Sequence, residues 1–342
     1  MQNQRRRGED TIENRHISMA LDSRINQSFH SDDVKEFSGE KLLLEILTLY
    51  YSWKRIHGNI SADKNFERLV VYHMAKVCTY WNVKDSSLVA EVLNCIFHSE
   101  GHFSMIFNHA GIYSNNALSV GQWLLTPEQH DAYLVEHHTV SFFLYHANKV
   151  RMTFCGTRFV DRCIEYPSRL APCYLAAILV KPQLLLLLLQ YGARLVPKYE
   201  ELRSFLDNFE AADLYIVLLK LISRLRETVD DDIDAALEND NSLKILSCLK
   251  FLLRASGQLQ KRSIELIIYQ ADNERNRNFM YKLMDTGILE SLRHRYLEPC
   301  PLKHLARCTI RNVLNENWQL PHGIPKLPLP LFIQKYLNLL ED

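Results

Sequence analysis

The sequence has no excess of charge of either sign, because 40 lysine and arginine residues balance 40 aspartate and glutamate residues. A chain without net charge has no overall field that collects nucleic acid or an anionic membrane. The sequence also lacks an uninterrupted apolar run of the ~20 residues that a bilayer requires. Residues 170–189 come nearest, but Lys181, Pro182 and Gln183 interrupt them. We therefore expect no nucleic-acid partner and no membrane span.

The common motifs of enzyme active sites are also missing. The sequence contains no P-loop, GxGxxG, GxSxG or HExxH pattern. Its 14 histidines complete no metal-ligand spacing with cysteine or carboxylate. One alternative is a cysteine hydrolase in which Cys155, followed by Gly156, is a nucleophile on a turn, but nothing singles out a histidine base for it. We expect no catalytic residue, no metal and no cofactor.

The eight cysteines include no CxxC pair, and most of them lie within apolar helical patterns. Free thiols in such positions behave as small apolar side chains, which is typical of a reducing compartment. We expect a cytoplasmic protein, with the nucleus as the alternative. Residues 1–38 are polar and charged, and we expect a disordered tail there instead of a secretory signal.

Residues 39–165 have the pattern of packed helices. Apolar residues recur at helical spacing from Leu42 to Trp53, from Phe66 to Trp81 and again after Ser86, so three amphipathic helices are expected. Gly58 is expected to end the first of them. The pattern does not decide the structure of residues 101–165.

Residues 171–193 follow the template of an ankyrin repeat. Pro172 is expected to open a first helix and Lys181-Pro182 to form the turn, and Gly192 should cap the second helix. We place the repeat at about residues 168–197, within a region of degenerate helical hairpins at 166–298. There, Val217–Ile222 is expected to be another second helix, and residues 231–257 are expected to form a helix, a turn and a helix.

Residues 299–342 contain two short apolar blocks. In the first, Pro301 is expected at the first helical position, followed by an apolar stripe of Leu302, Leu305, Thr309 and Val313, while Lys303, Arg307 and Arg311 lie off the stripe. The second block, 327–337, begins with Pro328 and Pro330, so a helix can start only after them. By periodicity alone, this segment is a helical hairpin that completes the core.

The residues of the two blocks resemble a SOCS box. Together with the repeat, they make the chain similar to the ankyrin-repeat and SOCS-box family, and most similar to members with one recognisable repeat. This resemblance implies an all-α fold, an ankyrin-like stack of helical hairpins followed by a C-terminal three-helix SOCS box at 299–342. The elongin C box would span 301–313 and the cullin box 325–340.

The resemblance also implies binding residues. Those expected to contact elongin C are Leu302, Leu305, Ala306, Thr309 and Ile310. Those expected to contact the cullin are Leu327, Pro328, Leu329, Pro330, Ile333, Tyr336 and Leu337. Ala306 stands where the family usually has cysteine, and losing one small buried group should cost about 1 kcal/mol. Cys308 lies about 200° further round the helix and cannot replace it.

For function, the resemblance implies the substrate-recognition subunit of a ubiquitin ligase, with elongin B, elongin C, cullin-5 and its RING subunit as partners and an unknown protein as substrate. Such a receptor acts by proximity and is not itself an enzyme. The alternative is a helical interaction scaffold whose SOCS-like tail packs on its own body and recruits no ligase. In that case, Leu302, Leu329 and Leu337 would be buried within the chain.

Overall fold

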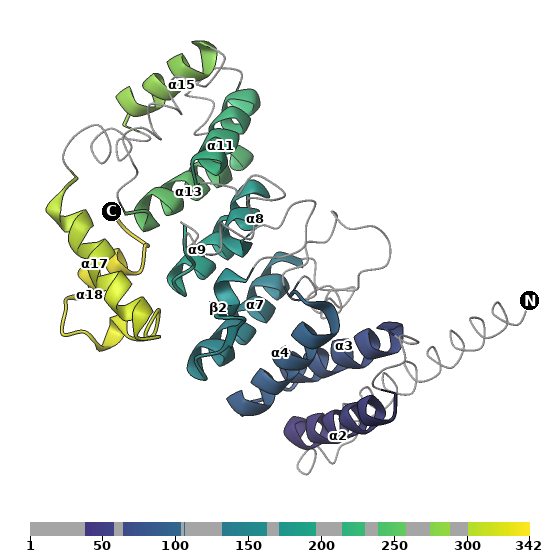
Figure 1. Ribbon diagram of the computed structural model, residues 1–342. Coiled ribbons are helices and arrows are strands. Elements are labelled where there is room, and N and C mark those ends of the chain that lie inside the picture. Colours follow the sequence, from purple (N-terminus) through teal and green to yellow (C-terminus); the bar gives the residue numbers. More distant parts are fainter. Residues whose placement is uncertain are drawn as a thin grey trace, which may run out of the picture. The chain divides into compact units, whose positions relative to one another are not determined.

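The computed structural model describes residues 38–57, 64–103, 106, 132–162, 171–195, 214–229, 239–257, 274–287 and 300–342. The chain forms two compact units, Met1–Phe159 and Val160–Asp342. Each unit is a set of packed helices (Figure 1). The expected tail before Ser38, the expected helix end at Gly58 and the expected boundary at residues 165 and 166 lie outside the described residues.

The first unit consists of helices and one small hairpin. Its helices are α2 (Gly39–His57), α3 (Lys64–Tyr80), α4 (Ser86–Glu100) and α7 (Ala132–Lys149). The antiparallel strands β1 (Thr153–Phe154) and β2 (Thr157–Arg158) follow α7 and precede the 3-10 helix η1 (Phe159–Asp161). α3 packs against α2 and α4, and α4 packs against α7. The three expected amphipathic helices therefore form one layer with α7, which the sequence pattern did not predict.

The helix α4 shows how local sequence sets these elements. Asp85 lies before the helix in an extended conformation, and its carboxylate accepts a hydrogen bond of 2.8 Å from the backbone N–H of Ser87. At the other end, Gly101 has a φ of 76°, which ends the helix in the left-handed region. Between these caps, Val89, Val92 and Ile96 are buried toward the core.

The second unit begins with the predicted ankyrin repeat. Its helices are α8 (Pro172–Ile178) and α9 (Pro182–Gln190), and each opens with the proline that the sequence places there. The small residues of α8 and the leucines of α9 are buried, and α8 packs against α9. Gly192 has a φ of 81°, a conformation in which L side chains are strained. The repeat thus forms as its pattern predicts.

A second hairpin stacks on the repeat. Its helices are α11 (Leu214–Val229) and α13 (Asp240–Ala255), and α11 packs on α8 while α13 packs on α9. Residues 217–222 lie within α11, so a helix is present where the sequence predicts one. Its expected place as the second helix of a repeat involves residues 196–213, which lie outside the described residues. The helix α15 (Glu274–Asp285) packs against α11.

The C-terminal segment contains α17 (Leu302–Glu316), the 3-10 helix η2 (Ile324–Lys326) and α18 (Leu331–Leu337). Pro301 was expected to be the first helical residue of α17, but it is the N-cap, one position earlier. A small core unites the three elements: Leu314, Leu320, Ile324 and Leu337 are buried against one another. In the part of the chain that the structure describes, no helix has the length and apolarity needed to cross a membrane.

Candidate functional site

One face of α17 is apolar and open to solvent. The side chain of Leu302 is 83% exposed, that of Val313 is 53% exposed and that of Leu305 is 39% exposed. Ala306 and Thr309 are exposed on the same face, and the Thr309 hydroxyl donates to the carbonyl oxygen of Leu305, 2.9 Å away. The Thr309 hydroxyl is therefore turned back onto the helix, so that its methyl group can continue the apolar surface.

The opposite face of α17 is polar and yet buried. His304, Arg307 and Arg311 recur at helical spacing and are only 2%, 0% and 8% exposed. The two arginines lie off the apolar stripe, as the sequence predicts, but they do not face solvent. This helix therefore inverts the usual pattern, in which the apolar face is packed and the charged face is wet.

Arg311 ties α17 to two other helices. Its guanidinium donates to the carbonyl oxygen of Leu337 in α18 at 2.8 Å and to that of Leu189 in α9. Burial lowers the pKa of Arg311 to about 10, and the neighbouring charge of Arg307 adds to this effect. The group stays cationic at neutral pH. A cation beside carbonyl groups in the last turn of a helix also interacts favourably with the helix dipole.

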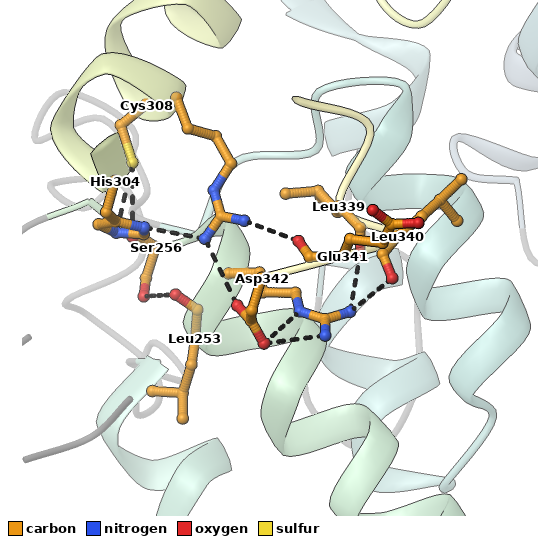
Figure 2. A network of polar contacts seen from close by, with 10 residues as sticks. Leu253, Ser256, His304, Cys308, Leu339, Leu340, Glu341 and Asp342 are labelled. Carbon is orange, nitrogen blue, oxygen red and sulfur yellow. Dashed lines mark hydrogen bonds and ion pairs between the residues drawn. The ribbon is translucent and has the colours of Figure 1, made fainter. Parts of the chain in front are cut away.

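A second network holds the other end of the buried face (Figure 2). Arg307 contacts His304 Nδ1 at 2.9 Å and donates to the carbonyl oxygen of Glu341 at 3.3 Å. His304 Nε2 lies 2.9 Å from the carbonyl oxygen of Ser256, which follows α13. The Asp342 carboxylate pairs with Arg254 of α13, with 2.9 Å between Nη2 and Oδ2. The segment is thus anchored to the stacked hairpins through polar contacts.

α17 also contacts the ankyrin repeat at Gly192, which follows the end of α9. The Asn315 side chain donates to the carbonyl oxygen of Gly192 at 3.1 Å. A Cβ atom at position 192 would overlap the carboxamide of Asn315. Gly192 is therefore favoured by its left-handed backbone, in which an L side chain is strained, and a Cβ atom there would also displace the Asn315 carboxamide from its hydrogen bond.

The expected elongin-binding residues share the open face of α17, with one exception. Ile310 is half-buried and packs against the small core of the segment. Cys308 lies on the body side, with its sulfur 3.7 Å from the carbonyl oxygen of Ser256. This position agrees with the expectation that Cys308 cannot replace a cysteine at Ala306.

The expected cullin-binding residues divide between surface and core. Pro328 and Pro330 are exposed, while Leu327, Leu329 and Ile333 are half-buried. Tyr336 and Leu337 are 6% and 1% exposed. The ring of Tyr336 lies under two cations, with Arg307 Cζ 4.1 Å and Lys303 Nζ 4.2 Å from its centroid. In this structure, Tyr336 and Leu337 therefore serve the fold.

Sequence reasoning missed two exposed apolar residues at the start of α18. Leu331 is 68% exposed and Phe332 is 61% exposed. Exposed large apolar side chains that lie next to one another are typical of an interaction surface. Their position directly after Pro330, at the start of a helix, could have indicated that they are exposed. The expected cullin contacts on this helix, Ile333, Tyr336 and Leu337, lie instead on the edge that packs inward.

Two further possibilities from the sequence were a nucleophilic Cys155 and a metal site. Cys155 is exposed at the turn between β1 and β2, with a φ of 50°. It lies on a turn, as the hydrolase alternative required. Among the residues that the structure describes, no group of three or more His, Cys, Asp and Glu side chains could hold a metal ion.

Comparison with known proteins identifies relatives. The SOCS box family model matches residues 298–338. Ankyrin repeat and SOCS box protein 17 of Canis lupus familiaris is 30% identical over 177 residues, which cover 52% of this chain and 52% of that protein. The protein of that name from Bos taurus is 31% identical over 179 residues, with the same shares. The one from Homo sapiens is 56% identical over 45 residues, 13% of this chain and 15% of that protein.

The chain therefore spans about half the length of the first of these relatives. No solved structure matches it.

Proposed function

From the premise that the chain ends in a SOCS box and is similar to ankyrin-repeat and SOCS-box proteins, we propose that it is the substrate-recognition subunit of a cullin–RING ubiquitin ligase. Its SOCS box binds elongin C, which is joined to elongin B, and then cullin-5 with its RING subunit. The helical body holds a target protein. The complex works in the cytoplasm.

The observation that carries this proposal is the open apolar face of α17. Leu302, Leu305 and Val313 remain exposed although the same helix buries two arginines. Fully burying one exposed leucine side chain stabilises a complex by roughly 1.5–3 kcal/mol. A groove on elongin C that buries Leu302 and Leu305 would gain free energy of this kind on binding.

The start of α18 provides a second surface. Pro328, Pro330, Leu331 and Phe332 are exposed there. We assign cullin-5 to this surface, and we replace the inward-facing Tyr336 and Leu337 by Leu331 and Phe332 as its principal contacts. Leu327, Leu329 and Ile333 support the surface from below, where they pack against the small core.

The mechanism is positional. Binding of the target and of the ligase to one chain raises the effective concentration of target lysines near the charged conjugating enzyme. Within the second unit, the contacts of Arg311, Arg307, Asn315 and Arg254 join the C-terminal segment to the stacked hairpins.

The scaffold alternative is favoured by one part of the same geometry. Leu337 is buried and Leu329 is half-buried within the chain, as a tail packed in cis requires. Leu302, however, is 83% exposed, and the alternative expects it to be buried. The tail therefore packs on its body through one side and keeps the other side available.

Co-expression with elongin B and elongin C tests the proposal. The full chain should elute with both elongins from gel filtration, and addition of cullin-5 with its RING subunit should shift the complex to a larger size. A chain that elutes alone, while an established SOCS-box protein captures the same elongins in parallel, would contradict the proposal and favour the scaffold.

A further inference from the structure

The first unit contains a cavity of about 380 Å³ whose lining is rich in basic groups. The turn after α3 contributes Asn82 and Lys84, and one face of α7 contributes the rest, including His138, Tyr145, His146 and Lys149. The α7 residues recur at helical spacing, so they form a continuous wall. The volume is at the lower end of the range for small-ligand sites and suits one or two side chains of a peptide.

The charge of the lining has one sign. Lys84 and Lys149 are both exposed, and none of the described residues that line the cavity carries a carboxylate. Glu40 and Asp85 neighbour this lining: Glu40 Oε1 accepts from the backbone N–H of Lys84 at 3.3 Å, and Asp85 Oδ1 accepts from the hydroxyl and the backbone N–H of Ser87. The hydrogen bonds from Ser87, the hydroxyl first, lower the pKa of Asp85. The Asp85 carboxylate is therefore ionised at the N-terminus of α4, where Ser87 holds its Oδ1.

The positive charges of Lys84 and Lys149 both act on the imidazole of His146. It is 3% exposed, and its Nδ1 lies 2.9 Å from the Ser86 hydroxyl. Its pKa is lowered to about 4, first by burial and then by the charges of Lys149 and Lys84, against a smaller opposite effect of Asp85. The imidazole is neutral at pH 7, so it adds a polar wall without adding charge. The two lysines therefore supply a common positive potential at this imidazole.

The cavity also has an aromatic wall. Tyr145 is 40% exposed, and Lys149 Nζ lies 5.6 Å from the centroid of its ring. This contact restrains the Lys149 side chain, which would otherwise be free to sweep through solvent. A pocket with two ammonium groups, neutral imidazole and amide groups and an aromatic face has the composition of a site for an acidic side chain with its adjoining peptide.

We propose that this cavity binds a glutamate or aspartate side chain of the target protein, with the carboxylate between Lys84 and Lys149 and the adjoining peptide against Tyr145. This inference rests on the proposed function, because it names the class of segment that the substrate receptor recognises. The target is thereby defined as a protein with an accessible acidic segment.

The test uses arrays of random nine-residue peptides with a fixed central residue, probed with the full-length chain. The central residue is glutamate in one array, glutamine in the second and phosphoserine in the third. The glutamate peptides should bind at least about tenfold more tightly than the glutamine peptides, a difference of about 1.4 kcal/mol, since hydrogen bonds to a charged group are stronger than those to a neutral one. The double variant Lys84→Glu, Lys149→Glu should lose this preference.

The matched control is Lys220→Glu, Lys250→Glu, which makes the same change in charge at two exposed lysines of the second unit. It should keep the preference, and circular dichroism melting should show that both variants fold. Equal binding of glutamate and glutamine peptides, binding of phosphoserine peptides alone, or an equal loss in both variants would overturn the inference. Elongin capture is measured on the same samples, so failure of the proposed function is seen separately.

Discussion

Arg311 in α17 donates a hydrogen bond to the carbonyl oxygen of Leu189, in the last turn of the ankyrin-repeat helix α9. The same guanidinium bonds the carbonyl oxygen of Leu337 at 2.8 Å. One side chain thus joins the repeat to both helices of the SOCS box. Its burial is costly for a cation, and these carbonyl groups offset the cost.

Replacing Arg311 with methionine should destabilise the second unit by about 2–4 kcal/mol, because two buried carbonyl groups lose their donor. Urea unfolding followed by circular dichroism measures the change. The control on the same helix is Lys303→Met, since Lys303 is exposed and its ammonium group lies over the Tyr336 ring. Equal stabilities of the two variants would show that Arg311 is not a structural joint.

Leu337→Ala should cost about 2–5 kcal/mol, because the side chain is 1% exposed and fills the core formed with Leu314, Leu320 and Ile324. Leu340, which is 45% exposed, provides the comparison, and Leu340→Ala should change stability by less than about 0.5 kcal/mol. Thermal unfolding of both variants decides the matter. If Leu337→Ala instead weakens cullin binding without lowering stability, Leu337 contacts the partner.

The ankyrin repeat was predictable because its signals are local. Pro172, Pro182 and Gly192 restrict the backbone at their own positions, so a single chain is enough to read them. The apolar stripe of α17 followed from spacing in the same way, but its exposure did not, because periodicity alone assigned this segment to the core. Local signals do not state which partner covers an apolar stripe.

The buried arginines were not predictable. A sequence pattern assigns Arg307 and Arg311 to the side away from the apolar stripe, and that side is usually wet. Their burial depends on carbonyl groups of residues far away in the sequence, such as Leu189 and Glu341. For the same reason, the resemblance that assigned Leu337 to the cullin contact could not show that Leu337 faces the core while Phe332 faces solvent.

The double substitution Leu331→Ala, Phe332→Ala should weaken the binding of cullin-5 by at least about tenfold, because truncation of a residue that is a binding hot spot costs about 2 kcal/mol or more. The side chains are 68% and 61% exposed, so the unfolding midpoint should not move. Biolayer interferometry with immobilised cullin-5 and the chain bound to elongins gives the affinity. An unchanged affinity would remove this surface from the cullin contact.

His146 should make the first unit less stable at acidic pH. Its pKa is about 4 in the folded chain and 6.5 in its ordinary state, so between these values the unfolded chain binds a proton that the folded chain does not. Stability should therefore fall as the pH is lowered from 6.5 to 4, by about 1–3 kcal/mol. The pKa of His137, which also lies in the first unit, is lowered chiefly by burial and adds to this slope.

The variant His146→Asn isolates this contribution, because asparagine does not titrate and can still bond the Ser86 hydroxyl. Denaturant unfolding at pH 4, 5, 6 and 7 should show a shallower dependence for the variant than for the wild type. Parallel curves for the two proteins would mean that His146 does not titrate differently on folding.

The central claim is that the open face of α17 is the elongin C contact. Isothermal titration of purified elongin B and elongin C into the full chain tests it with three proteins. These are the wild type, a double variant that carries Leu302→Ala and Leu305→Ala, and a control double variant that carries Leu44→Ala and Leu49→Ala. The control removes two leucines of α2 that are 49% and 65% exposed. We expect tight binding by the wild type and the control, and none by the Leu302 and Leu305 variant, with all three equally stable. Equal affinity of all three proteins would contradict the account.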